Sequence, residues 1–312
     1  MNIEKFKKKK LGILFFNNKS KIVTTTFDDI YSVLCNKKID IEVIEICSFN
    51  DLISSEILEK ISRCDMICKL VFGDYNRLGI VQGILDCLGK KYTGHLLKTD
   101  LVSQDKLLIK AIMVRAHINT PDYFEIDQNN PKDVLSCLDS QKRYILKPSC
   151  TNTSIGIMLP SDFTELENQL EKLTNNKYGK YYVERYIDGR ILSMGIMPMN
   201  NGDFFYTNLL EYLYETDTGF MDENWKSAPK RSIAFDVPNN LLEEAKKIAL
   251  FLHKAIDAKG ATRTDFVYAE GKLYALEINS NIGFSRNHDF PTAAYGKKTY
   301  EDLVLMYLET AF

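Results

Sequence analysis

Residues 262–279 of the chain read TRTDFVYAEGKLYALEIN and contain more structural information than any other stretch of the sequence. Residues 262–268 and 272–278 are each expected to form a β-strand. Between them, Ala269-Glu270-Gly271 supplies a glycine where a tight turn needs one. The stretch therefore predicts an antiparallel hairpin.

Four side chains of this hairpin are chemically important. Residues two apart in a strand point to the same face, so Arg263 and Asp265 project together, as do Glu277 and Asn279. If the strands pair as the turn indicates, three oxygen-bearing side chains and one guanidinium converge on one patch. Hard oxygen ligands without histidine or cysteine favour magnesium or manganese. An equally open interpretation is a surface salt bridge of Arg263 with Asp265 or Glu277.

Two upstream segments bear on that choice. Residues 147–156, KPSCTNTSIG, place a lysine at the end of an expected strand, followed by small hydroxyl residues that can offer hydrogen bonds to phosphate oxygens. Residues 183–189, VERYIDG, end a strand and enter a turn, which suits a hinge whose free backbone edge could pair with a purine. Taken alone, the first segment is more often a polar hairpin loop, and the second is a weaker signal still.

The first hundred residues predict a parallel sheet. Short apolar runs alternate there with helical periodicity, which indicates β-α-β units whose ligands bind at the carboxyl ends of the strands. Over the whole chain, further expected strands are 11–16, 41–46, 66–71, 144–146, 155–158, 181–184, 191–197 and 204–210. Expected helices are 27–35, 52–61, 80–88, 241–258, 300–311 and one that begins at Ser103. The apolar stripe expected for the helix from Ser103 consists of Leu107, Leu108, Ala111, Ile112 and Val114.

Composition and charge exclude several classes of protein. The 312 residues are 45% hydrophobic and 26% charged, as in an ordinary soluble globular protein and unlike disordered, collagen-like or coiled-coil chains. Forty basic against 42 acidic residues give a net charge of −2. A balance so near zero gives no electrostatic reason to bind nucleic acid or an anionic membrane.

The cysteines and the N-terminal region predict a cytoplasmic protein. The seven cysteines include no C-x-x-C pair and no zinc spacing, which favours a reducing compartment. A basic run at residues 7–10 precedes the apolar residues 11–16 and imitates a secretory signal. Its apolar part is shorter than the roughly 7 to 15 residues of a signal core, and no segment approaches the roughly 18 apolar residues of a membrane span.

In their order and spacing, these segments resemble the ATP-grasp fold, and specifically the D-alanine-D-alanine ligase family. The resemblance is strong from Lys147 onward, moderate through Gly73, Gly79, 82–83 and 92–94, and thin before residue 70. It implies an α/β protein, α+β in its C-terminal part, with an ATP-grasp fold behind an N-terminal Rossmann-like domain that contains a parallel sheet.

The resemblance also implies how the chain is divided. The implied units are a Rossmann-like domain over residues 1–98, a central ATP-grasp subdomain over 99–188, and a C-terminal ATP-grasp subdomain over 189–312 that contains the metal site. Both boundaries between these units are soft by a few residues.

The resembled family implies an activity. Its members use ATP to convert a carboxylate into an acyl phosphate, which an amine then attacks to form an amide. Cations must surround the transfer site, because like-charge repulsion opposes the attack of a carboxylate on a polyphosphate. The resemblance therefore implies an ATP-dependent carboxylate-amine ligase that uses ATP and two magnesium ions, with manganese as the alternative. Its partners would be small amino-acid-like carboxylates and amines; a homodimer is left open, since members are commonly dimers.

Several residues are implied by the resemblance to hold the nucleotide. These are Lys106 and Lys147 at the α- and β-phosphates, Thr153 and Ser154 on a loop that closes over the reacting groups, Glu184 at the adenine amino group, and the backbone near Arg185 and Ile187 at the purine edge. Lys106 could instead be a solvated helix lysine, and Glu184 a surface strand residue.

The resemblance assigns the metal and the oxyanion to the hairpin and the loop after it. Asp265, Glu277 and Asn279 would bind the two magnesium ions, with Glu277 bridging them. Arg263 would stabilise the tetrahedral oxyanion, helped by the backbone at Gly283. The alternative for Asp265 is a structural ion pair.

The sequence departs from the family pattern mainly at substrate positions. The phosphate-loop glycine is Asn152, the ribose-binding glutamate falls on Ile191, the first-domain glutamate aligns near Lys21, the mobile-loop lysine and tyrosine fall near Asp217 and Thr218, and the serine near the second substrate's carboxylate falls on His288. The nucleotide and metal groups are mostly retained, whereas the substrate groups are mostly changed. We therefore expect a ligase with substrates other than two free D-alanines.

Three other functions stay open at this point. The chain could be an ordinary D-alanine-D-alanine ligase of cell-wall synthesis with a diverged first domain. It could be a nucleotide-binding protein that has lost catalysis, or an ATP-grasp kinase that stops after phosphoryl transfer.

Overall fold

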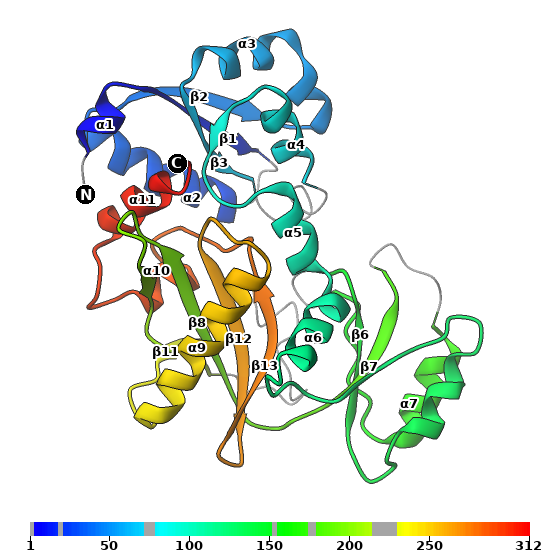
Figure 1. Cartoon of the computed structure of the whole chain (residues 1–312). Helices are drawn as coiled ribbons and strands as arrows, with labels where there is room; N and C mark the ends of the chain where they lie inside the picture. The colour runs from blue at the N-terminus through cyan, green and yellow to red at the C-terminus, as the bar shows by residue number, and fades with distance from the viewer. Residues whose placement is uncertain (1–2, 18–20, 72–78, 152–154, 174–178, 214–229) are drawn as a thin grey trace.

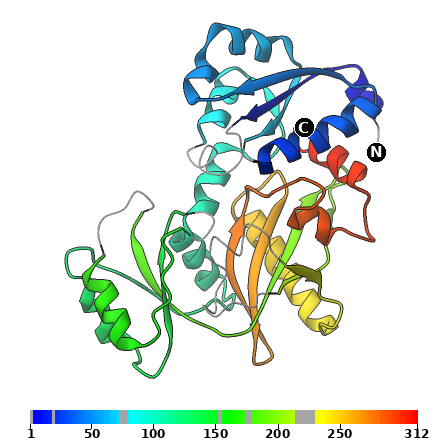
Figure 2. The same ribbon diagram turned by 180° about the vertical axis from the view of Figure 1, so that it is seen from behind.

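The computed structural model describes residues 3–17, 21–71, 79–151, 155–173, 179–213 and 230–312. In this part of the chain, one parallel and two antiparallel sheets follow one another (Figure 1). The parallel sheet lies at the top of the view, and the two antiparallel sheets lie below it on either side of two consecutive helices; the view from behind agrees (Figure 2). None of the described helices is long and apolar enough to span a bilayer.

The parallel sheet has the strand order β2-β1-β3-β4. Its strands are β1 (Lys10–Phe16), β2 (Asp40–Ile46), β3 (Met66–Leu70) and β4 (Lys91–Tyr92). Its helices are α1 (Glu4–Lys7), α2 (Lys21–Asn36), the short 3-10 helix η1 (Phe49–Ile53), α3 (Ser55–Arg63) and α4 (Ile80–Cys87). Along β1, Ile13 and Phe15 pack toward α2, while Leu14 and Phe16 pack toward α3 and α4. Burial on both faces explains why residues 11–16 of β1 form a continuous apolar run.

A helix from the far end of the chain completes the core beside this sheet. Helix α11 (Tyr300–Glu309) contributes Leu303 and Leu308 to the same core as Leu11 and Ile30. Its Tyr307 hydroxyl donates to the Lys69 carbonyl of β3 at 3.0 Å. The first unit is therefore built from both ends of the chain, which Figure 1 shows as blue and red elements side by side.

The middle unit is a three-stranded antiparallel sheet with the order β5-β7-β6. Its strands are β5 (Tyr123–Glu125), β6 (Tyr144–Pro148) and β7 (Tyr181–Arg185), and its helices are η3 (Pro131–Cys137) and α7 (Phe163–Glu171). Leu166 and Leu170 of α7 pack with Val183 of the sheet. Residues 155–158, expected to form a strand, make only a single bridge between Met158 and Leu146.

Two helices, α5 (Leu97–Gln104) and α6 (Lys106–Arg115), replace the single helix expected from Ser103. The helix is interrupted at Asp105. The Asp105 carboxylate accepts hydrogen bonds from the N–H groups of Leu107 and Leu108 and so caps α6. The expected apolar stripe of this helix was wrong. The structure buries Ile109, Lys110 and Met113, whereas Leu108 and Val114 are 42% and 54% exposed.

The last unit is an antiparallel sheet with the order β11-β10-β8-β12-β13, to which β9 adds by pairing with β8. Its strands are β8 (Arg190–Pro198), β9 (Phe204–Tyr206), β10 (Leu210–Tyr212), β11 (Arg231–Ile233), β12 (Thr262–Ala269) and β13 (Lys272–Asn279). Helix α9 (Asn239–Ala255) covers one face, where Ala245 and Leu252 pack with Phe266 and Ala275. The short helix α10 (Asp289–Ala293) lies on the other face, where Phe290 reaches Gly195 of β8. The strand expected over 204–210 is two strands, because β9 and β10 pair with different parts of β8.

The hairpin predicted from residues 262–279 is present. Its two-residue loop consists of Glu270 and Gly271, with φ values of 50° and 74°. Positive φ at both loop residues is the mark of a type I′ turn, which matches the right-handed twist of the strands it joins. The division of the whole chain at residues 98 and 188 stays a prediction.

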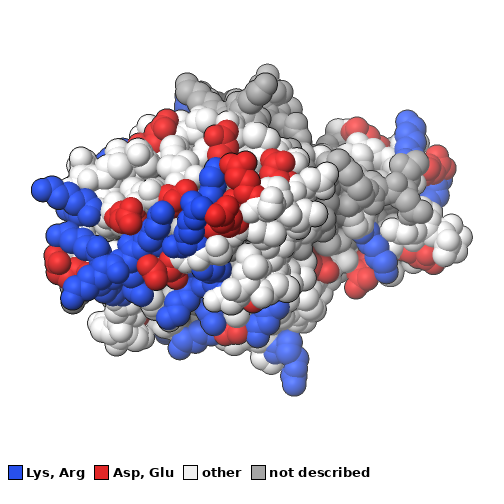
Figure 3. All heavy atoms as spheres, turned by 90° about the horizontal axis from the view of Figure 1, so that it is seen from above, with Lys and Arg blue, Asp and Glu red and all other residues white. Residues whose placement is uncertain are grey.

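Charged residues crowd the outer surface of the first unit. Seen from above, lysines and arginines gather on one side with acidic residues between them (Figure 3). Near the N-terminus, three lysines have acidic partners: Lys5 with Glu309, Lys7 with Glu4 and Lys10 with Glu42. The basic run of the sequence is thus partly neutralised by neighbouring acids.

A buried histidine gives the fold a measurable pH dependence. His253 of α9 is 1% exposed, and its Nδ1 lies 2.9 Å from the Thr262 hydroxyl. Burial, with smaller contributions from His95 and Lys254, lowers the pKa of His253 to about 3. Below its unfolded pKa of about 6.5, the unfolded chain binds a proton that the folded chain does not. The contribution of the neutral His253 to the free energy of unfolding is therefore complete above about pH 6.5 and is lost as the pH falls toward 3.

We expect His253→Gln to flatten that dependence. Between about pH 6 and 4, the slope of the unfolding free energy against pH should fall by about 1.4 kcal/mol per pH unit. Urea titrations at several pH values measure the slope, and the same substitution at the exposed His117 serves as the control. An unchanged slope in the His253 variant would show that the residue is already charged in the folded protein.

Candidate nucleotide and metal site

A β-bulge brings the hairpin's chemical groups onto one face. From the turn, the strands pair Ala269 with Lys272 through to Phe266 with Ala275, and then the register shifts so that Asp265 pairs with Glu277. Leu276 is the extra residue on β13. If the register set by the turn continued without this shift, Asp265 would pair with Leu276. Glu277 would then point to the face covered by α9, because a one-residue slip reverses the direction of every side chain.

The result is the cluster that the sequence predicts. Arg263 pairs with Asn279 and Asp265 with Glu277, all on the sheet face away from α9. Asn279 Nδ2 lies 3.0 Å from Asp265 Oδ2 and 3.2 Å from Glu277 Oε1. Arg263 grips Asp265 with two hydrogen bonds of 2.7 Å from Nε and Nη2. The ion pair left open above is therefore present, and it lies within the cluster.

The oxygen-rich donor set fits a hard divalent cation. Burial raises the pKa of Asp265, an effect that Glu277 adds to and the Arg263 guanidinium opposes. A further cation beside these carboxylates would favour their ionised forms and so oppose the increase in the pKa of Asp265. Across the described residues, no group of three or more histidine, cysteine, aspartate or glutamate side chains is placed to hold a metal. A metal here would thus rely on two carboxylates, the Asn279 amide oxygen and ligands from outside the chain.

Lys106 connects this cluster to the loop after β6. It is the first residue of α6, and its Nζ donates to the Thr151 carbonyl at 2.6 Å and lies 3.5 Å from Glu277 Oε2. Its backbone N–H donates to the Ser149 carbonyl at 2.9 Å. The interpretation of Lys106 as a fully solvated helix lysine does not hold, because only 12% of its side chain is exposed. Thr153 and Ser154, like Asn152, lie outside the described residues.

A second charged group lies between α6 and the middle sheet. Glu184 of β7 is 2% exposed, and its two carboxylate oxygens lie 2.5 Å from Lys147 Nζ and 2.5 Å from Lys110 Nζ. Burial acts to raise the pKa of Glu184, but the two lysines outweigh it and hold the pKa below its ordinary value. Glu184 is thus not the surface strand residue that one interpretation allowed.

Lys110 was missed by sequence reasoning, although a signal for it exists. It is a lysine flanked by apolar residues in the run LLIKAIM of α6, and it is completely buried. A lysine is almost never buried without a partner, so its place in an apolar run indicates a buried acid opposite it.

The residues expected at a purine edge follow Glu184. The Arg185 N–H already donates to the Asp122 carbonyl at 2.8 Å, so its carbonyl is the candidate for a purine contact. Ile187 follows in the segment that crosses from β7 to β8. Ile191, where the family has its ribose-binding acid, packs instead with Leu210 and Tyr212.

Gly283 lies in the loop after β13, where it meets His288. A Cβ at Gly283 would lie 1.5 Å from His288 Nδ1, so only glycine allows this ring to pack against the backbone. Burial lowers the pKa of His288, which keeps the ring neutral at pH 7. The same loop leads into Asp289, which sequence reasoning also missed and which accepts a 2.7 Å hydrogen bond from Arg263 Nη1.

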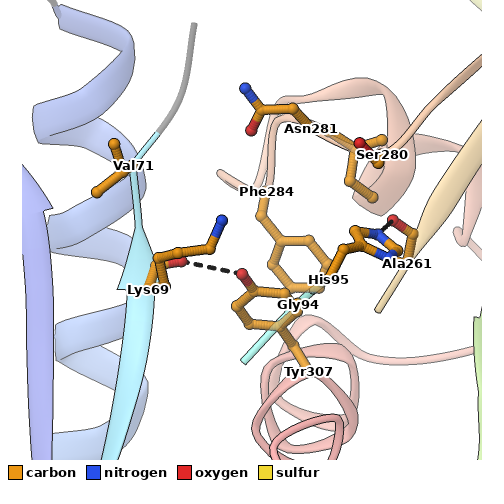
Figure 4. A pocket seen from close by; sticks show the side chains of 10 residues that line it. Lys69, Val71, Gly94, His95, Ala261, Ser280, Asn281, Phe284 and Tyr307 are labelled. Atoms are coloured by element: carbon orange, nitrogen blue, oxygen red, sulfur yellow. Dashed lines mark hydrogen bonds between the residues drawn. The ribbon is translucent and has the colours of Figure 1, made fainter. Parts of the chain in front are cut away.

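A small cavity of about 20 Å³ lies behind this loop, where the first sheet meets the last unit (Figure 4). Lys69, His95 and Tyr307 line it. His95 accepts from the Gly260 N–H at its Nδ1 and donates from Nε2 to the Ala261 carbonyl, so it is the neutral Nε2–H tautomer. Such a cavity has room for about one water and is too small for a substrate.

A buried carboxylate near this cavity links the first sheet to the end of β13. Asp100 of α5 is 1% exposed and accepts hydrogen bonds from Gln82 of α4 and, at 2.7 Å, from the Ser280 hydroxyl. Lys69 Nζ lies 3.7 Å away. Ser280 directly follows Asn279, so this network fixes the end of β13 relative to the first sheet.

The arrangement of these sheets defines the protein as an ATP-grasp protein. Residues 112–309 match the family model described as the D-ala D-ala ligase C-terminus. This match spans well over half of the chain, and the chain belongs to that family. The fold and the family expected from the sequence are confirmed.

Curated relatives and solved structures agree with this assignment. The chain is 29% identical over 252 residues to the D-alanine--D-alanine ligase of Fusobacterium nucleatum, covering 79% of this chain and 80% of the relative. It is 27% identical over 259 residues to that of Thermotoga maritima, covering 82% of each. The structure of the Bacillus anthracis D-alanine--D-alanine ligase complexed with ATP superposes with a TM-score of 0.79 over 97% of both chains at 22% identity. The D-Ala:D-Ser ligase of Enterococcus faecalis gives 0.78 over 97% and 99% at 17% identity.

Proposed function

We propose that this protein is an ATP- and magnesium-dependent ligase that joins a carboxylate to an amine through an acyl phosphate, with a substrate pair other than two free D-alanines. The observation that carries the proposal is the position of Lys106. Its ammonium contacts both the Thr151 carbonyl of the loop after β6 and the Glu277 carboxylate of the metal cluster. Groups suited to phosphate and to metal thus lie within the reach of one side chain.

Each part of the site has a role in this reaction. Lys106 and Lys147 hold the α- and β-phosphates, with Thr153 and Ser154 covering the reacting groups, while Glu184 and the backbone at Arg185 and Ile187 receive the adenine. Asp265, Glu277 and Asn279 would hold two magnesium ions, or manganese, and bound there such ions would neutralise charge on the transferred phosphate. Arg263 and the backbone at Gly283 stabilise the oxyanion formed when the amine attacks.

The proposed cellular setting follows the chemistry of the chain. All seven cysteines are free thiols, which suits the reducing cytoplasm. The names of the relatives support small amino-acid-like substrates. The boundaries at residues 98 and 188 and a homodimeric assembly are part of the same proposal.

A screen with hydroxylamine tests the function without knowledge of the natural amine. Hydroxylamine intercepts an acyl phosphate and gives a hydroxamate, which forms a coloured complex with ferric iron, so amino acids and small carboxylates can be compared for hydroxamate and ADP together. We expect at least one carboxylate to give both products in equal amounts. Phosphate release with D-alanine alone would identify an ordinary D-alanine-D-alanine ligase. Tight ATP binding without turnover would indicate a binding protein, and a phosphorylated product that accumulates would indicate a kinase.

We expect Arg263→Lys to separate the two chemical steps. A lysine ammonium cannot reproduce the planar fork that grips Asp265 and Asp289, so the amide-forming step should slow about 100-fold. Formation of ADP in a single turnover without amine should change by less than about threefold. Rapid-quench measurements of ADP and amide test this, with Arg190→Lys, another forked arginine that binds Glu211, as the control. Equal losses in both steps would contradict an oxyanion role.

A further inference from the structure

Asp289 places a carboxylate of the protein itself on the candidate oxyanion arginine. Its Oδ2 accepts hydrogen bonds from Arg263 Nη1 at 2.7 Å and from the Tyr212 hydroxyl at 2.9 Å. Its Oδ1 lies 3.1 Å from Arg231 Nη1. Burial acts to raise the pKa of Asp289, but Arg263 and Arg231 outweigh it and hold the pKa below the ordinary value. The group is therefore an ionised carboxylate at neutral pH.

The fold fixes this carboxylate in place. Asp289 begins α10, and the next residue, Phe290, packs directly on Gly195 of β8, where a Cβ would lie 2.5 Å from the Phe290 ring. Phe290 is 1% exposed and stacks on Phe284 with 5.8 Å between ring centroids. The start of α10 is thus anchored on the same sheet face as Arg263, because a glycine leaves room for it.

The guanidiniums around Asp289 are already matched by protein carboxylates. Arg263 donates two hydrogen bonds to Asp265 and one to Asp289. Arg231 binds Asp289 and the Asn287 carbonyl. Arg286, in the loop between β13 and α10, lies 3.5 Å from Asp29 and stacks over Tyr300. A substrate carboxylate entering here would compete with Asp289 for Arg263 and would be repelled by it.

Arg263 contacts carboxylates at two different edges of its guanidinium. Its Nε and Nη2 bind Asp265, which Asn279 links to Glu277, and its Nη1 binds Asp289. In the proposed reaction, the first of these edges faces the transferred phosphate. The phosphate is the leaving group of the second step, so the amine approaches the acyl carbon from the other direction. In that direction Arg263 meets Asp289, Tyr212 and Arg231.

We propose that the acceptor of this ligase is an amine without a carboxylate next to its amino group, because Asp289 supplies to Arg263 the negative charge that an amino acid would otherwise bring. The amine or amino-amide class fits this site, and free amino acids are disfavoured. The inference rests on the proposed function and names one of its two substrate classes.

A matched pair of nucleophiles tests this acceptor class. O-Ethylhydroxylamine and aminooxyacetate are both reactive toward acyl phosphates and differ at one end, which is a methyl group in the first and a carboxylate in the second. With the donor found in the hydroxylamine screen, the wild-type protein should use O-ethylhydroxylamine at least tenfold more efficiently in kcat/KM. Asp289→Asn, which keeps the shape but removes the charge, should reduce that preference at least fivefold. Asp236→Asn, which changes an exposed partner of Arg190, should leave it unchanged.

Each result has a definite meaning. Equal or better use of aminooxyacetate by the wild-type protein, or a preference that Asp289→Asn leaves intact, would overturn the acceptor class while hydroxamate formation still supported the ligase. Absence of hydroxamate with every donor would overturn both proposals. Circular dichroism of each variant confirms folding, and Asp289→Ser provides a second uncharged variant.

Discussion

Glu277→Gln should lower turnover roughly 100- to 1,000-fold while leaving the fold intact. Glu277 shares one sheet face with Asp265 and Asn279, and its Oε2 lies 3.5 Å from Lys106 Nζ. Glutamine keeps the shape but removes the negative charge that Glu277 would bring to the proposed metal site. The side chain is 29% exposed and outside the apolar core, so the melting temperature should change by no more than about 2 °C.

Steady-state ADP release and differential scanning calorimetry measure the two effects. Glu270→Gln is the matched control, because Glu270 lies in the turn of the same hairpin and takes no part in the cluster. We expect the control to retain full activity. Near-normal activity of Glu277→Gln would remove Glu277 from the metal site, whereas a large drop in its melting temperature would give it a structural role instead.

Glu184→Leu should be the most destabilising single substitution of the site, at about 3–5 kcal/mol of unfolding free energy. The carboxylate lies 2.5 Å from Lys110 Nζ, and the two side chains are 2% and 1% exposed. Removal of the acid leaves an ammonium buried without its counter-charge. Loss of the Glu184 carboxylate costs less at Lys147, because 14% of the Lys147 side chain is exposed and its ammonium can turn toward solvent.

A double variant separates charge from packing in this pair. Replacing both partners, as in Glu184→Leu with Lys110→Met, removes the unpaired charge and should recover most of the lost stability. Glu243→Leu is the control, because it breaks an exposed pair with Lys246 and should cost less than about 0.5 kcal/mol. Urea unfolding of the variants measures these values. If the double variant were as unstable as the single one, packing rather than charge would explain the loss.

The sequence predicts the local parts of this protein well. The hairpin of residues 262–279 was predicted because its two strand-like stretches and its glycine turn are properties of neighbouring residues. The parallel sheet could be predicted for the same reason, since strands buried on both faces form continuous apolar runs such as residues 11–16. The ligase family followed from the joint spacing of several such segments.

The parts that depend on distant neighbours were less accessible. Glu277 and Asp265 were expected on one face from the turn, but they reach it only through the bulge at Leu276, which the sequence does not reveal; a register continued from the turn without a shift would place them on opposite faces. The burial of Lys110 depends on Glu184 in another unit, which explains why the expected stripe of α6 was wrong. The contact between Asp289 and Arg263 arises because Phe290 packs on Gly195, a packing relation across almost a hundred residues.

The placement of α11 against the parallel sheet has a consequence for synthesis. The strands β1 to β3 leave the ribosome more than two hundred residues before Leu303 and Leu308 are translated. Until then, the nascent sheet lacks part of its cover and displays apolar side chains that a chaperone could recognise. We expect the first unit to reach its protease-resistant state only after translation of α11, so that stalled ribosomes that carry a shorter chain would present a cleavable first sheet.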